Sequence, residues 1–184
     1  MLLDRKHIAL EHRNPDLVVI NYGTNESTYL SYVQKQYESE LIRAIGRVRA
    51  AVPDASILIM SPMDRGQRSG DAIATMPAIP EIVAIQQRIA EKTGCGFFNT
   101  YQAMGGNGTM GRWYNRHPAM VGADLIHPSP QGARIVAQLL TGQLLIGYER
   151  YMENHPASQN RLSPPAISQT SDQQNKAVRP TGVQ

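Results

Sequence analysis

The clearest indication of the fold class is the stretch Asp16-Leu17-Val18-Val19-Ile20-Asn21-Tyr22-Gly23-Thr24-Asn25-Glu26. Its first half is a short apolar, β-branched run bounded by turn residues, which predicts a strand buried on both faces. Asn14-Pro15 comes just before it and ends a helix expected within residues 1–14. The second half is polar, so the stretch predicts a buried strand that ends in a polar turn.

The segments that follow alternate between strand and helix patterns. Residues 56–60 and 96–99 are predicted strands, and amphipathic helices are expected over about 28–52 and 82–92 and from Pro128-Ser129-Pro130-Gln131-Gly132 to about Tyr151. Residues 63–80 and 101–126 are expected to be irregular. This alternation predicts an α/β fold, with a parallel sheet between two layers of helices.

Length and composition limit the function classes. The 184 residues fit one domain, expected over 1–153, and a Gln-, Ser-, Pro- and Asn-rich tail at 154–184 that we expect to be disordered. Lys and Arg total 18 against 15 Asp and Glu without clustering, so no nucleic-acid partner is expected. Neither a membrane span nor a signal peptide is predicted from the sequence.

Asp124-Leu125-Ile126-His127, directly before the last predicted helix, is the sharpest chemical motif. A carboxylate three residues ahead of an imidazole can accept a hydrogen bond from Nδ1–H and leave Nε2 free to take a proton from a nucleophile. The alternative is a helix cap beside a histidine without a chemical role.

Gly23-Thr24-Asn25-Glu26 is the second candidate motif, at the end of the first predicted strand. Gly23 permits a close backbone approach, and Asn25 can donate its amide N–H₂ to a developing oxyanion. A plain Gly/Asn turn is the alternative.

Three other features are less specific. The glycines in the segment 103–110 suit either a backbone lying against a ligand or a mobile loop. Trp113 and Tyr114 could form the wall of a sugar site or part of the core. The other histidines lack metal-ligand spacing, and no phosphate loop is present, so no metal or organic cofactor is expected.

Together, the two motifs resemble blocks of the SGNH hydrolase superfamily, the GDSL-type esterases. Residues 16–26 resemble its third block and 123–128 its fifth, and the similarity covers most of 14–151. Glu26, the Ala103-Met104-Gly105-Gly106 segment and Trp113 are most similar to the bacterial branch that contains peptidoglycan O-acetylesterases.

This resemblance implies a flavodoxin-like sheet and a serine esterase acting on O-acetyl groups of a carbohydrate such as peptidoglycan. It implies that His127 is the general base, that Asp124 orients it, and that Asn25 and Gly23 belong to the oxyanion hole. It also implies no cofactor, an acylated carbohydrate as the binding partner, and a periplasmic or extracellular full-length protein.

The family's nucleophile is a serine in a Gly-Asp-Ser motif, which this sequence does not contain. Gly70-Asp71-Ala72 is only a partial match, and Ser27, Ser61 and Ser69 lie in the wrong motifs. We therefore expect the chain to be the C-terminal part of the hydrolase, with a sheet that lacks its first strand and the second-block glycine. A missing N-terminal segment or a carbohydrate-binding module would then precede it.

Three alternatives remain open at this point. The first is a non-catalytic glycan-binding pseudo-esterase, and the second is a half-enzyme completed by a partner chain that carries Gly-Asp-Ser. The third is an unrelated α/β module whose motif matches are accidental. A sheet without its first strand would also expose unpaired backbone and apolar surface, which predicts marginal stability or self-association.

Overall fold

The computed structural model describes residues 10–156. Its strands are β1 (Leu17–Asn21), β2 (Ser56–Met60), β3 (Gly66–Ser69), β4 (Ala72–Thr75) and β5 (Gly96–Phe98). Its helical elements are η1 (Glu26–Thr28), α2 (Leu30–Tyr32), the π-helix η2 (Val33–Tyr37), α3 (Glu38–Ala51), α4 (Ala78–Thr93), α5 (Thr100–Ala103), α6 (Thr109–Tyr114) and α7 (Pro130–Asn154). The described residues through Leu145 belong to one compact unit, and those from Ile146 belong to a second.

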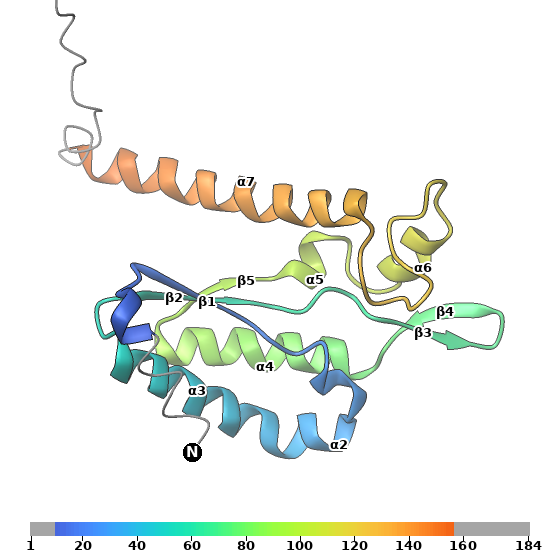
Figure 1. The fold of residues 1–184 in the computed structure, drawn as a ribbon, viewed down its shortest axis with the longest axis horizontal. Coiled ribbons are helices and arrows are strands. Elements are labelled where there is room, and N and C mark those ends of the chain that lie inside the picture. The colour runs from blue at the N-terminus through green and yellow to red at the C-terminus, as the bar shows by residue number, and fades with distance from the viewer. Residues whose placement is uncertain (1–9, 157–184) are drawn as a thin grey trace, which may run out of the picture. The chain divides into compact units, whose positions relative to one another are not determined.

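A parallel sheet in the order β1-β2-β5 is the centre of the first unit. Val19 pairs with Leu58, and Leu58 with Gly96. Helices α3 and α4 lie on one side of the sheet, and the first turns of α7 lie on the other (Figure 1). The predicted α/β fold with a parallel sheet between helical layers is therefore confirmed.

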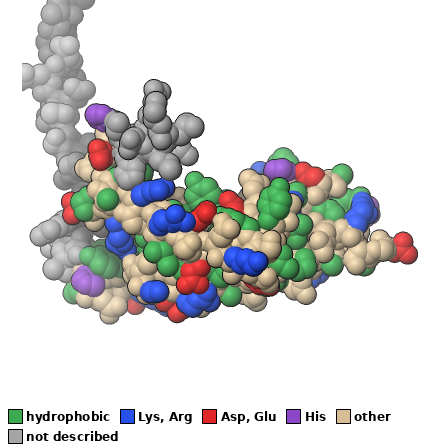
Figure 2. Space-filling view, turned by 90° about the horizontal axis from the view of Figure 1, so that it is seen from below, with side chains coloured by type: hydrophobic (Ala, Val, Ile, Leu, Met, Phe, Trp, Pro, Cys, Tyr) green, Lys and Arg blue, Asp and Glu red, His purple; other side chains and the backbone are tan. Residues whose placement is uncertain are grey.

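The main core lies between the sheet and the α3–α4 layer. Its buried members come from β1, β2 and the helices that follow them: Ile20, Val33, Tyr37, Leu41, Ile45, Ile57, Ile59, Ala78, Ile82, Ile89 and Ala90. Helix α4 ends at Gly94, whose left-handed φ of 65° suits glycine. The outer surface of this layer carries interspersed basic and acidic side chains, including the pair Arg88–Glu38 at 2.6 Å (Figure 2).

The prediction that the first strand is buried on both faces is wrong. Leu17 and Val19 are 46% and 47% exposed, although Ile20 on the opposite face is buried. β1 pairs with β2 alone, so it is an edge strand of the described sheet. A continuous apolar run indicates that both faces of a strand can be buried. Whether each face is covered depends on elements that are distant in the sequence.

Two segments expected to be irregular contain regular structure. Residues 63–80 include the antiparallel hairpin of β3 and β4, with a turn at Gly70, whose φ is 61°. Residues 101–126 include the end of α5 and all of α6. These elements are too short to give a clear hydrophobic period, and contacts with distant residues stabilise them instead.

A second core joins α6 to the start of α7. It contains Met104, Met110, Trp113, Met120, Val121 and Val136. Trp113 is buried there, so the structure supports the core interpretation of this residue and not a sugar-site wall. At Gly132, a Cβ atom would lie 2.2 Å from the Met120 carbonyl oxygen, so this glycine is needed for the close approach of the backbones.

Gly132→Ala is expected to lower the free energy of unfolding by about 1–3 kcal/mol, because the added methyl group must displace backbone. Gly142→Ala on the same helix is the matched control, since a Cβ there meets nothing within 4 Å. Denaturant titrations of both variants would measure the difference. Equal stabilities for the two variants would contradict the packing at Gly132.

Two predictions fall partly outside the described residues. Residues 10–13 are helical and end before Asn14, whereas the rest of the helix expected within 1–14 lies outside the description. Helix α7 ends at Asn154, and residues 157–184 of the predicted disordered tail are not described. Among the residues that are described, no helix is long and apolar enough to cross a membrane.

Candidate active site

Asp124 and His127 form the hydrogen-bonded pair that their spacing predicts. His127 Nδ1 lies 2.6 Å from Asp124 Oδ2, while Asp124 Oδ1 accepts the backbone N–H groups of Ile126 and His127 at 3.0 Å each. Leu125 between them has φ 60°, which folds the segment tightly enough for these bonds to form. The carboxylate is thus oriented by the same short loop that carries the imidazole.

The charge state of Asp124 determines which ring nitrogen of His127 carries the proton. The hydrogen bond from His127, followed by those from the two backbone N–H groups, lowers the pKa of Asp124 to about 2. An ionised carboxylate can only accept hydrogen bonds, so Nδ1 of His127 must be the donor. In the neutral ring Nε2 is then unprotonated, and with its side chain 81% exposed His127 is accessible to accept a proton there.

Asp124 is expected to remain ionised at pH 3.8, where an unperturbed aspartate would be half protonated. Because its folded pKa is lowered, its contribution to stability is present above pH 3.8 and is lost as the pH falls towards about 2. A ¹³C NMR titration of the carboxyl carbon would measure this. In His127→Ala the midpoint should rise, and a wild-type midpoint near 3.8 would contradict the hydrogen-bonded pair.

The turn after β1 presents Asn25 on the surface. Gly23 has φ 121°, and a Cβ there would lie 2.8 Å from Ile82 Cγ2, so this position requires glycine. The Gly23 N–H donates to Glu26 Oε2 at 3.0 Å, which closes the turn. Asn25 is the N-cap residue of η1, but its side chain makes no capping hydrogen bond and no hydrogen bond to any other described residue. The side-chain amide is therefore available to a ligand.

One cavity of about 350 Å³ contains residues of both predicted motifs. It is lined by Asn21, Tyr22, Gly23, Thr24, Asn25, Glu26, Met63, Ile126 and His127. The structure therefore brings Asn25 and His127 to the same cavity beyond the carboxyl end of β1, where parallel α/β sheets bind ligands. An imidazole base and an amide donor facing one space are suited to acyl transfer through an oxyanion.

None of the three serines named in the sequence analysis lines this cavity. Ser27 is 2% exposed and donates to the Thr24 carbonyl, and Ser61 is buried and donates to the Pro62 carbonyl. Ser69 lies in β3. The glycine-dense segment 103–110 bonds to a side chain of the protein itself, since Arg112 donates to the carbonyls of Gly105 and Asn107.

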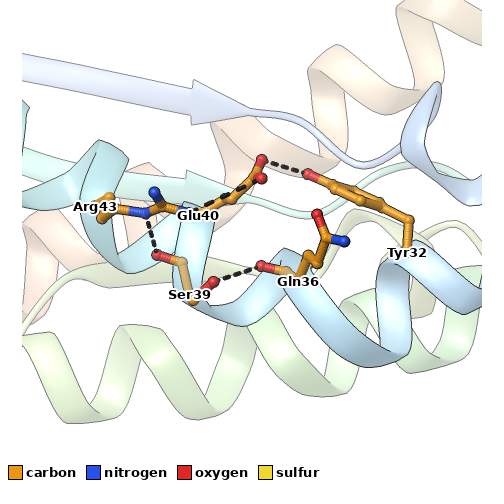
Figure 3. A network of polar contacts seen from close by, with 5 residues as sticks. All are labelled: Tyr32, Gln36, Ser39, Glu40 and Arg43. Carbon is orange, nitrogen blue, oxygen red and sulfur yellow. Dashed lines mark hydrogen bonds and ion pairs between the residues drawn. The ribbon is translucent and has the colours of Figure 1, made fainter.

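A polar network follows the Asn25 turn. Tyr32 donates to Glu40 Oε2 at 2.6 Å, and Glu40 also faces Arg43 (Figure 3). Burial and then the bond to Glu40 raise the pKa of Tyr32 to about 12. The network joins α2 to α3 across the π-helical turn η2.

Asp64 and Arg65 were not predicted to lie near the candidate site, because they belong to the segment 63–80 that was expected to be irregular. Asp64 is 2% exposed and accepts from Thr75 Oγ1 and the Met110 backbone N–H. Arg65 contacts the turn that carries Asn25. Their position in the sequence could have indicated this, because residues that directly follow a buried parallel strand lie at the carboxyl end of the sheet, where the other site residues are found.

Comparison with known proteins points to one family. A family model described as "GDSL-like Lipase/Acylhydrolase family" matches residues 1–135. A solved structure titled "Peptidoglycan O-acetylesterase in action, 5 min" is 27% identical, with a TM-score of 0.67 over 77% of this chain and 40% of the other. The search of curated proteins found no match.

Two further structures share the fold at lower identity. An acetylxylan esterase from Geobacillus stearothermophilus is 21% identical, with a TM-score of 0.52 over 76% of this chain and 64% of the other. The periplasmic domain of a lipopolysaccharide acetyltransferase from Salmonella ser. Paratyphi A is 10% identical, with a TM-score of 0.55 over 77% and 61%. This chain thus spans less than two thirds of each of these three proteins.

Proposed function

Because this chain belongs to the GDSL-like lipase/acylhydrolase family, we propose that it supplies the base and oxyanion residues of a serine esterase acting on O-acetylated carbohydrate. The observation that carries the proposal is the cavity shared by Asn25 and the His127 imidazole, whose Nδ1 is bonded to Asp124. The resemblance to a peptidoglycan O-acetylesterase supports the choice of an acetylated glycan as substrate.

The proposed reaction has two steps. His127 Nε2 takes the proton of a serine hydroxyl as its oxygen attacks the acetyl carbonyl carbon, and the Asn25 amide donates to the oxyanion that forms. When the intermediate collapses, the imidazolium returns the proton to the sugar oxygen, which leaves as a hydroxyl. His127 then activates a water that releases acetate and restores the serine, while Asp124 stabilises the charged imidazole in both steps.

The serine is proposed to come from a Gly-Asp-Ser element outside these 184 residues. Two features of the described sheet support a separate serine-bearing element, in addition to the absence of the motif. One edge of β1 is unpaired, and Leu17 and Val19 on this strand are half exposed. A further strand could pair with that edge and carry a serine to the carboxyl end of the sheet, next to Asn25. The element would belong either to the same polypeptide or to a partner chain.

Gly23 is proposed to shape the oxyanion turn rather than to donate to the oxyanion, since its N–H is bonded to Glu26. We further propose that the full-length protein acts in the periplasm or outside the cell, where peptidoglycan is accessible. A carbohydrate-binding module in the same protein would fit that role.

The test is to isolate the native protein from its own cells, determine its intact mass, and assay it on O-acetylated peptidoglycan for released acetate. A product that carries Gly-Asp-Ser, alone or in a partner chain, and releases acetate would support the proposal. A product that binds the glycan without releasing acetate and contains no such serine would overturn it in favour of a glycan-binding pseudo-esterase.

A further inference from the structure

We propose that Arg65 is a positioning residue for the reaction, because the Asp64–Gly66 segment links the Asn25 turn to the Asp124–His127 loop. The inference rests on the proposed function and adds a residue that neither motif contains. The segment follows β2 and enters β3. It does not line the cavity, but it contacts both the Asn25 turn and the Asp124–His127 loop.

On one side, the Arg65 guanidinium holds the turn. Its Nη1 lies 2.6 Å from the Thr24 carbonyl oxygen, 3.1 Å from Ser27 Oγ and 2.9 Å from Thr28 Oγ1. These three oxygens flank Asn25 on both sides in the sequence. A half-buried cation bonded to both flanks restricts the direction in which the Asn25 amide points.

On the other side, the Gly66 backbone holds the loop of the base. Its N–H donates to the Leu125 carbonyl at 2.9 Å, in the middle of the Asp124–His127 segment. A Cβ on Gly66 would lie 3.0 Å from Leu125 Cβ, so the two backbones pack in close contact.

Asp64 fixes the segment itself. Its carboxylate accepts from Thr75 at 2.7 Å and from the Met110 N–H at 2.8 Å, which ties the segment to β4 and α6. The turn that carries the oxyanion donor and the loop that carries the general base are therefore each bonded to one of two consecutive residues, Arg65 and Gly66, of one anchored segment. Because the base must deprotonate the serine that attacks the same carbonyl whose oxyanion the amide stabilises, this link would set the separation of the two groups.

The first test uses the native protein and needs no activity. Hydrogen exchange is measured at the backbone amides of Ser27 and Thr28, which are bonded to Gly23 and Asn25. In Arg65→Met their exchange should rise at least about tenfold, while amides in β2 stay unchanged. Arg68→Met is the matched control, because Arg68 lies three residues further along, in β3, where its guanidinium is over the Tyr114 ring.

The second test uses the native esterase that the proposed function requires. Arg65→Met should lower kcat by about 10–100-fold with KM within about twofold, because misplacing a reacting group affects the transition state more than substrate binding. Arg65→Lys should restore part of kcat, and it also replaces Arg65→Met if that variant does not fold.

The outcomes separate the two proposals. Unchanged exchange in the turn, or unchanged kcat with Arg65→Met, would overturn the positioning role even if the enzyme is active. An unsubstituted native protein without hydrolytic activity would overturn the proposed function, while the exchange experiment would still report whether Arg65 holds the turn.

Discussion

His127→Ala in the native protein is expected to lower the proposed esterase kcat by about 10⁴–10⁶-fold, the effect that removal of the base has in serine hydrolases. The reason is that Nε2 of this ring is the proposed acceptor of the serine proton, and the second imidazole nitrogen is committed to Asp124. Acetate release from O-acetylated glycan at saturating substrate would measure the change, and KM should alter little.

His155→Ala is the matched control for that experiment. It removes an exposed imidazole that stacks on Tyr151 and lies outside the cavity, so it should leave kcat unchanged. His127→Ala is expected to fold, because the ring is largely exposed and its one side-chain hydrogen bond, to Asp124, lies at the surface. If His127→Ala retained wild-type turnover in a protein of verified sequence, the assignment of the base would be wrong.

Asn25→Ala is expected to lower kcat by about 10²–10³-fold, the usual effect of removing one oxyanion donor. The side chain makes no hydrogen bond within the described residues, so its loss should cost little stability and act mainly on the transition state. Steady-state kinetics combined with a thermal unfolding curve would separate these two effects.

Two further variants sharpen this second experiment. Asn25→Asp keeps the size but replaces the donor with a carboxylate that repels an oxyanion, so it should be at least as slow as Asn25→Ala. Asn107→Ala changes an exposed asparagine away from the cavity and should behave as the wild type. Full activity in Asn25→Asp would refute a role for this side chain in stabilising the oxyanion.

Much of the fold could be predicted because its signals are local. The apolar runs at Leu17–Asn21 and Ser56–Met60 are long and β-branched enough to identify strands, and their alternation with helices favours a parallel sheet. The β3–β4 hairpin was missed because Gly66–Ser69 and Ala72–Thr75 are short and partly polar. Pairing with each other stabilises such strands, and a local pattern does not report it.

For the candidate site, the sequence predicted the Asp124–His127 pair, because a three-residue spacing permits the hydrogen bond within one short loop, and the structure contains that bond. It also predicted a polar turn after β1, whereas the need for glycine at position 23 follows from its φ of 121° and its contact with Ile82 in the structure. The family resemblance implied that Asn25 and His127 share a site, and the tertiary structure shows that these residues, about a hundred residues apart, line one cavity. The contacts of Arg65 and the exposed face of β1 were beyond the sequence, since both depend on which distant segments pack together.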